Sequence, residues 1–181
     1  MRNILLAVVT SLLIAAPAAA QGTGWSGNFN LILGAKGMDH GEWGPWDEHA
    51  EAGFHLDFQP TGWLLSIAAS VMGSESEQFL GTVLETTETW LGVRKIWPVG
   101  QHIRPYLGGG LAFITADATG FFVDSGDATG IWLGGGVYWT LGGHFNLGLD
   151  ISASSAEATM ASGFKGNIGG GHAGLLLGYH F

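Results

Sequence analysis

Residues 145–153 read FNLGLDISA, and this segment shows most clearly the pattern that organises the chain. Large apolar residues alternate with small or polar ones, so Phe145 and Ile151 share one face of an extended chain and Asp150 lies on the other. Strict alternation is typical of a β-strand, in which successive side chains point to opposite faces. A tilted membrane strand needs about 9–11 residues. The segment therefore predicts a strand of membrane-spanning length with one apolar and one polar face.

The same alternation recurs along the chain. Eight segments show it: 25–33, 51–58, 63–71, 88–97, 104–113, 131–139, 145–153 and 172–181. The connections between them alternate in length. Short ones lie near 59–62, 98–101 and 141–143, and long ones at 36–49, 73–86, 115–129 and 155–170. Short turns at one end and longer loops at the other are typical of outer-membrane barrels. We therefore predict an all-β fold, an eight-stranded antiparallel up-and-down transmembrane β-barrel.

The distribution of charge separates a membrane barrel from a soluble, lipocalin-like one. The apolar faces of the eight segments carry one charge, Lys95, two residues from the end of its segment. A charge on the lipid face near the bilayer midplane costs about 2–4 kcal/mol. The opposite faces carry the other strand charges, and we predict that they form a charged network in the lumen: Glu51, Asp57, Glu88, Arg94, Arg104, Asp150, His55 and His172. A soluble barrel would have the reverse polarity.

Composition excludes several other classes of protein. Charged residues make up 12% of the chain, against about 25% in a usual soluble domain. Six basic residues against fifteen acidic ones argue against nucleic-acid binding, which needs a basic surface. The absence of cysteine rules out disulfides and thiolate metal sites. No motif indicates a cofactor, and we expect none.

The first twenty residues predict a secretory signal peptide. A basic start at Arg2 precedes an apolar core at 4–16, and an A-x-A cleavage sequence ends at Ala20. The apolar core is shorter than the ~20 residues of a spanning helix, which argues against a retained anchor. We expect a signal peptide at 1–20, removed to leave a barrel domain at 21–181 in the outer membrane.

Aromatic residues gather at one end of the predicted strands. With the N-terminus in the periplasm, one outward-facing set lies at the periplasmic level: Trp25, Phe58, Trp63, Trp97, Trp139, Phe145 and Phe181. Amphipathic rings favour the headgroup region of a membrane. The shared parity of these residues predicts a periplasmic aromatic girdle.

Two local patterns resemble the small eight-stranded outer-membrane β-barrel family, the OmpA-like and OmpX-like type. Residues 88–94 (ETWLGVR) and 104–110 (RPYLGGG) look like that superfamily's fourth and fifth strands. The ending Leu177, Tyr179 and Phe181 resembles the C-terminal signal read by the barrel-assembly machinery. The resemblance covers the whole of 21–181 and implies a fold and an assembly route. It implies no particular activity.

The predicted interior favours a filled barrel. Eight strands leave a lumen just wide enough for side chains, and bulky inward residues such as Trp90 and Tyr138 alternate with inward glycines. We expect a monomer with a structural or interaction role and no wide pore, in contact with membrane lipid and lipopolysaccharide. The alternative is a narrow gated channel for ions or small solutes, with His55 and His172 as titrating groups.

A lipid-modifying enzyme is a third alternative. Barrel enzymes that deacylate lipid A use a His–Ser pair near the outer leaflet, and the corresponding region here is 150–155. No histidine stands there, and the strand histidines face inward. Ser154 or Ser155 would therefore have to take a base from a loop. We predict no catalytic residues.

The first long loop is rich in groups that bind divalent metals. Its candidates for metal ligands are Asp39, His40, Glu42, Asp47, Glu48 and His49. Their spacing matches no known metal motif, and the alternative is a solvated acidic loop. Residues 124–127 (DSGD) resemble a calcium turn still more weakly, and we interpret them as a β-turn.

Overall fold

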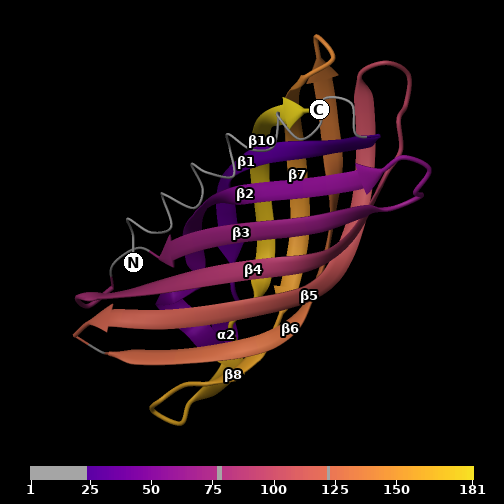
Figure 1. Cartoon of the computed structure of the whole chain (residues 1–181). Helices are drawn as coiled ribbons and strands as arrows, with labels where there is room; N and C mark the ends of the chain where they lie inside the picture. Colours follow the sequence, from indigo (N-terminus) through magenta and orange to yellow (C-terminus); the bar gives the residue numbers. More distant parts are fainter. Residues whose placement is uncertain (1–23, 77–78, 122) are drawn as a thin grey trace.

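The computed structural model describes residues 24–76, 79–121 and 123–181 and contains a closed barrel (Figure 1). The barrel strands are β1 (Trp25–Gly37), β2 (Glu48–Pro60), β3 (Ser66–Ser76), β4 (Thr82–Ile96), β5 (Ile103–Gly120), β6 (Asp124–Leu141), β7 (Phe145–Ser155) and β10 (Gly170–His180). Each pairs antiparallel with its neighbours, and β1 closes the ring on β10. The predicted fold is confirmed. The predicted signal peptide, 1–20, lies outside the described residues.

Side chains alternate between the inside and the outside of the barrel as the sequence predicts. Along β7, Ile151 is 72% exposed while Asp150 is 3% exposed. In the cross-strand register, outward Leu149 is opposite outward Leu175. The exterior is therefore apolar and the interior polar, the polarity of a barrel surrounded by lipid. In the described part of the chain, no helix is long and apolar enough to cross a membrane.

Most strands are longer than predicted, and β5 and β6 exceed their predicted lengths by the most. We expected loops at 73–86 and 115–129, but β4 begins at Thr82, and β5 and β6 are joined only by 121–123. The expected turn at 124–127 is part of β6. The alternation does continue through these residues, but with small or polar side chains in place of large apolar ones. The extensions make β4, β5 and β6 project well beyond the other strands (Figure 1).

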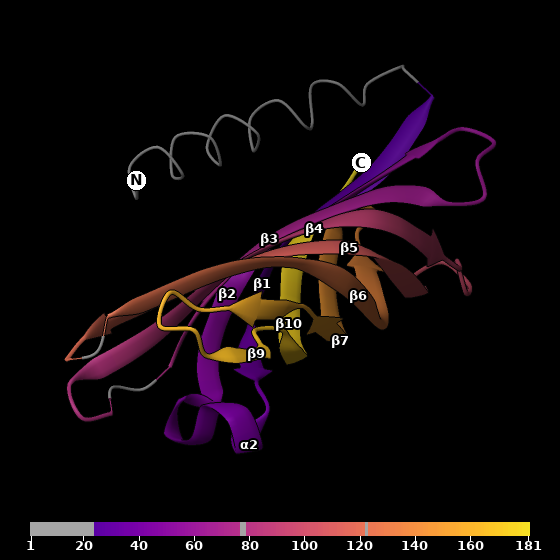
Figure 2. The same ribbon diagram turned by 90° about the horizontal axis from the view of Figure 1, so that it is seen from below.

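The remaining long connections contain structure of their own. The connection expected at 36–49 begins later, because β1 continues to Gly37, and it folds into the short α2 (His40–Trp43) and η1 (Gly44–Trp46). The connection expected at 155–170 contains a hairpin, β8 (Glu157–Thr159) paired with β9 (Lys165–Asn167). Figure 2 shows α2 and this hairpin at the same end of the barrel. We call it the loop end, and the opposite end, with connections 61–65, 97–102 and 142–144, the turn end.

The turn end corrects one strand boundary. The segment predicted at 63–71 begins as a strand only at Ser66, so Trp63 lies in the preceding turn. The outward Lys95 has a local reason to be there, because its ammonium group donates a hydrogen bond to the carbonyl of Leu64 in that turn at 2.8 Å. A charge at this end of a strand can reach polar groups without entering the lipid.

Candidate functional site: the lumen and the loop end

A buried ion pair occupies the lumen toward the turn end. The guanidinium of Arg94 lies 3.2 Å from the carboxylate of Asp57, and both side chains are 1% exposed. Arg94 also donates to the hydroxyl of Tyr138 at 2.8 Å, and the amide of Asn28 donates to Asp57 at 2.7 Å. Several partners thus share each charge, as buried ions require.

Aromatic rings fill the middle of the lumen. Tyr106 and Tyr138 stack with ring centroids 4.5 Å apart, and the guanidinium of Arg94 lies 4.6 Å from the centroid of the Tyr106 ring. The Tyr106 hydroxyl donates to Asp150 at 2.5 Å. Gly136 makes room for this ring, since a Cβ there would lie 2.7 Å from its Cζ. The rings and their glycine neighbour leave little open space at this level.

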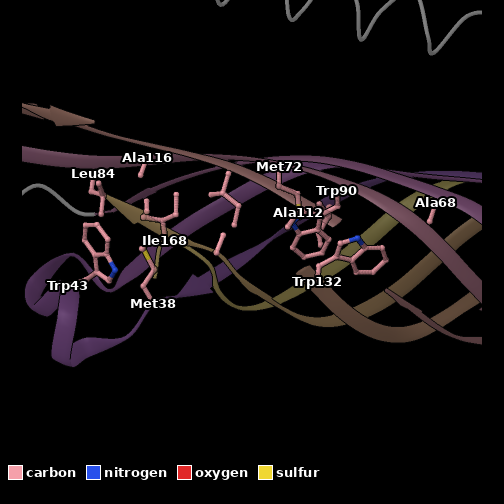
Figure 3. Packing of buried hydrophobic residues seen from close by; sticks show 14 of the residues in the cluster. Met38, Trp43, Ala68, Met72, Leu84, Trp90, Ala112, Ala116, Trp132 and Ile168 are labelled. Atoms are coloured by element: carbon pink, nitrogen blue, oxygen red, sulfur yellow. The ribbon is translucent and has the colours of Figure 1, made fainter. Parts of the chain in front are cut away.

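Trp90 and Trp132 form the next layer. Their rings stack at 5.1 Å with an interplanar angle of 9°, and Figure 3 shows the pair inside the barrel. The Trp90 indole N–H donates to Glu88 at 2.8 Å. His55, from the charged set, is fully enclosed beside Trp90, with centroids 6.4 Å apart. This layer separates the Arg94 group from a second charged group.

The second charged group contains a cation that the sequence analysis did not include. Lys36 lies 2.7 Å from Glu88, and its side chain is completely buried. Its ammonium group also donates to the hydroxyl of Thr86 and the carbonyl of Ile168, both at 2.9 Å. Lys36 has the inward parity of Ile32, so extending the first predicted strand, 25–33, by three residues would have found it.

His172 connects the remaining acids of this group. Its Nδ1 lies 2.6 Å from Glu51, and its Nε2 lies 3.6 Å from Glu88 and 3.2 Å from the hydroxyl of Ser154. We expected Ser154 to have no strand histidine as a neighbour, and that expectation is wrong: β7 and β10 are adjacent, so both side chains point into the lumen. A serine that contacts a histidine, which in turn contacts a glutamate, is the arrangement of a hydrolase catalytic triad. Here, however, the His172 side chain is completely buried.

Arg104 differs from the other predicted network members. It is partly exposed at the turn end, and its guanidinium contacts the ring of His180, with Nη1 2.7 Å from Nε2. Among the described residues, no carboxylate lies within ion-pair distance of it. Arg104 was predicted as a member of the charged network, but the nearby Asp57 pairs with Arg94 and Asn28 instead.

Apolar side chains close the loop end of the lumen. They are contributed by β4 and β5 and by the loops, and Figure 3 shows them gathered at this end: Met38, Trp43, Leu84, Ala116 and Ile168. The Trp43 indole N–H donates to the carbonyl of Asn167 at 2.8 Å. This bond ties α2 to the β8–β9 hairpin, so both loops cover the lumen together.

The predicted girdle residues lie on the exterior at the turn end. Four are between 44% and 57% exposed: Trp25, Trp63, Trp97 and Phe145. The other three are partly buried: Phe58, Trp139 and Phe181. The terminal residue is held in place, since its N–H donates to Gly27 at 3.0 Å and its ring lies 5.7 Å from that of Phe58. Leu177 and Tyr179 face outward from β10, at 41% and 42% exposure.

The metal-ligand candidates do not converge on one point, and most of them have structural contacts of their own. Asp39 accepts the Gly41 N–H as the cap of α2, and His40 contacts Asp47 at 2.8 Å on the surface. Glu42 accepts the Asn167 N–H at 2.7 Å. His49 is buried and lies 2.9 Å from the Trp46 carbonyl, while Glu48 is exposed at the start of β2. Within the described residues, no three His, Asp or Glu side chains are grouped to hold a metal ion.

A groove of about 420 Å³ opens at the loop end, between the α2–η1 loop, the extended strands and the β8–β9 hairpin. Its lining is mostly apolar and includes Trp43, Leu84, Ala118, Met160 and Phe164. The alternation in the sequence does not predict this groove. It requires the strand extensions and the hairpin, both of which fall where loops were expected.

A closed barrel with an apolar exterior and charges enclosed in its lumen is the architecture of an integral outer-membrane protein. The chain belongs to the outer membrane protein beta-barrel domain family, which matches residues 4–181. Membership implies an outer-membrane location.

Solved structures with the same fold have little sequence in common with this chain. Neisserial surface protein A is 12% identical, with a TM-score of 0.66 over 87% of this chain and 97% of its own. The N-terminal β-barrel domain of Pseudomonas aeruginosa OprF is 16% identical, with a TM-score of 0.58 over 89% and 100%. Ail, the attachment invasion locus protein of Yersinia pestis, is 14% identical, with a TM-score of 0.56 over 87% and 99%. Comparison of the sequence with curated proteins gave no match.

Proposed function

We propose that this protein is a monomeric outer-membrane barrel with a sealed lumen, which acts through its loop end as a structural or interaction protein. The observation that carries the proposal is the filling of the lumen. Two charged groups are separated by the stacked rings of Trp90 and Trp132, and an apolar layer around Trp43 and Ile168 lies over them. A continuous aqueous path would have to break each of these layers.

Planar-bilayer recording tests the sealed lumen. We expect no steady conductance from the purified, folded protein, because the charges that would line a pore are paired with one another. Trp132→Ala removes one stacked ring and is the variant in which leakage should first appear. A large, stable conductance of the unmodified protein would overturn the proposal.

A narrow gated channel is the second candidate, and one observation favours it. Several buried polar atoms of the described lumen have no hydrogen-bond partner, among them Asn30 Nδ2, Glu51 Oε1, His55 Nε2 and Ser70 Oγ. Buried polar atoms need partners, and water is the usual one. Brief conductance steps that disappear in Glu51→Gln would support this candidate over the sealed barrel.

We also propose that the Ser154–His172–Glu51 arrangement is structural rather than catalytic. Ser154 is 6% exposed, and its hydroxyl accepts the Gly170 N–H at 3.2 Å. A nucleophile must reach its substrate, and this one is enclosed by the barrel wall. A fluorophosphonate probe should leave the folded protein unlabelled. Labelling that is lost in Ser154→Ala would show a reactive serine and contradict the assignment.

The exterior supports proposals on lipid contacts and assembly. Aromatic side chains at the turn end, such as Trp25 and Trp97, suit the periplasmic headgroup region, and the apolar band above them suits contact with lipid and lipopolysaccharide. The outward series Leu177, Tyr179 and Phe181 is the proposed signal for the barrel-assembly machinery. A signal peptide at 1–20 would direct the chain to that route.

A further inference from the structure

The loop end stands well above the lipid-facing band. On β5 the last large outward apolar side chain of the band is Phe113, and the exposed tip begins at Phe121. Eight residues of strand span about 26 Å, and a strand tilt of about 35–45° makes this about 20 Å of height. Polar outward residues, Thr115 and Asp117, lie between. The groove at the loop end is therefore outside the protein's own membrane.

Aromatic side chains form the walls of this groove. Trp43 and Phe164 pack edge to face with centroids 5.5 Å apart, and Trp46 lies at the same distance from Phe79. Phe164 is 43% exposed and Val123 is 83% exposed at the mouth. Apolar surface of this kind, away from lipid, marks an interaction site.

The surroundings of the groove are strongly acidic. Of the fifteen Asp and Glu residues, four face the lumen and Glu77 lies outside the described residues, and the other ten are all at the loop end. Lys165 is the single exposed lysine or arginine that the described residues place there. Glu42 and Asp124 stand at the groove itself. Hydrogen bonds from Ser162 lower the pKa of Asp124, so this carboxylate stays charged.

We propose that this groove binds a cationic amphipathic segment of a polypeptide, with an apolar side chain packed against the exposed face of the Trp43–Phe164 pair and basic groups against Glu42 and Asp124. The inference rests on the proposed interaction role and names the chemistry of the partner. Charge complementarity selects this occupant, because long-range attraction favours a positively charged partner. Anionic glycans and anionic lipid headgroups would be repelled by the same carboxylates.

Binding to model peptides tests the proposal. The probe is a short fluorescein-labelled peptide of alternating lysine and leucine with one tryptophan, measured by fluorescence anisotropy against the protein in phosphatidylcholine nanodiscs, with empty nanodiscs subtracted. Two control peptides test the two properties of the probe. One has glutamate in place of lysine and tests the charge, and the other has serine in place of leucine and tests the apolar side chains. We expect binding of the lysine–leucine peptide alone, weakening as salt is added.

Matched variants locate the binding site. Phe164→Ala should weaken binding about tenfold, as expected for one lost aromatic contact, and Glu42→Gln should weaken it and reduce its salt dependence. Leu80→Ala and Glu75→Gln change an exposed apolar residue and an exposed carboxylate outside the groove, and should leave affinity unchanged. Heat-dependent gel mobility verifies that each variant is folded.

Three outcomes would overturn the proposal: no binding of the lysine–leucine peptide, equal binding of the glutamate peptide, or equal weakening by the control variants. The protein could instead form a dimer in detergent without nanodiscs. If Phe164→Ala dissociated that dimer, the groove would be assigned to a second copy of the chain. The proposed sealed lumen is tested separately, by the planar-bilayer conductance measurement. A conducting protein that still binds the peptide would refute the sealed lumen and leave the groove assignment intact.

Discussion

Lys36 shows how a single residue couples the barrel wall to the loop that covers the lumen. Its ammonium group joins Glu88 in the wall of β4 to the carbonyl of Ile168 in the covering loop. The desolvation of a buried ammonium is offset only by several close partners. The same contacts therefore compensate the charge and hold the loop over the lumen.

Replacing Lys36 by methionine should destabilise the barrel by about 3–5 kcal/mol, because Glu88 would stay buried without its cation. Urea unfolding in detergent, followed by tryptophan fluorescence, measures the change. The double variant Lys36→Met with Glu88→Leu should recover most of it. Lys95→Met is the control, since Lys95 is partly exposed at the turn end and should change stability by less than about 1 kcal/mol. Equal effects of the two lysine variants would contradict this account.

The two arginines should differ in the same assay. Arg94→Met leaves Asp57 enclosed without its ion pair and should cost about 3–5 kcal/mol. Arg104→Met removes a partly exposed side chain that contacts a histidine ring, and should cost less than about 1 kcal/mol. A larger loss for Arg104→Met than for Arg94→Met would show that the turn-end contact, and not the buried pair, stabilises the lumen.

At this scale the sequence predicted which way each strand residue points, but not its partners. Inward parity followed from alternation, so Glu88 and His172 could be placed in the lumen. Their neighbours depend on the register between strands, which alternation alone does not determine. This is why the Ser154–His172 contact was not foreseen, and why Arg104 was placed in the charged network although no described carboxylate forms an ion pair with it.

At the scale of elements, the β5–β6 hairpin shows where patterning loses information. Its inward residues shrink from Trp132 in the lumen to Ala116 and Ala128 at the loop end. Small residues weaken the apolar signal although the strand continues. The ladder is maintained by backbone pairing, for example between Ala116 and Gly126. The length of the strands above the membrane could therefore not be predicted from the alternation. The wall of the groove, which these strands form, could not be predicted either.

The last residue of the chain gives an element-scale prediction. Deleting Phe181 removes a ring contact with Phe58 and two backbone hydrogen bonds to Gly27. One aromatic at the turn end contributes about 1.5–3 kcal/mol of apolar burial, which a closed barrel should survive. We expect the shortened chain to refold from urea into detergent but to reach low outer-membrane levels in cells, with unfolded chain in the periplasm.

The same experiment separates assembly from stability. Normal outer-membrane levels would refute a role of Phe181 as the assembly signal, and failed refolding would make its role structural. Leu141→Ala is a suitable control, because Leu141 is an outward apolar residue at the turn end that is not part of the terminal series. Its levels in cells should match those of the unmodified protein.

At the scale of the whole molecule, strand number and closure were the most predictable features. Each depends on a physical requirement that acts on every strand, since an unpaired edge cannot face lipid. The loop end follows no such rule. Its helix, hairpin and groove depend on individual contacts, such as the bond from Trp43 to Asn167, which no periodicity encodes.

Closure leads to a prediction for the intact protein. In a closed ring, β1 pairs with β10 and every strand has two neighbours, so no strand can peel away alone. The detergent-folded protein should therefore resist dodecyl sulfate at room temperature and run faster on an unheated gel than after boiling, because the compact barrel migrates ahead of the extended chain. Lys36→Met should lower the temperature at which the fast band disappears, since unfolding requires the lumen contacts to break together. Identical mobility before and after boiling would contradict a closed barrel, and an unchanged conversion temperature in the variant would show that the buried ion pair does not limit its unfolding.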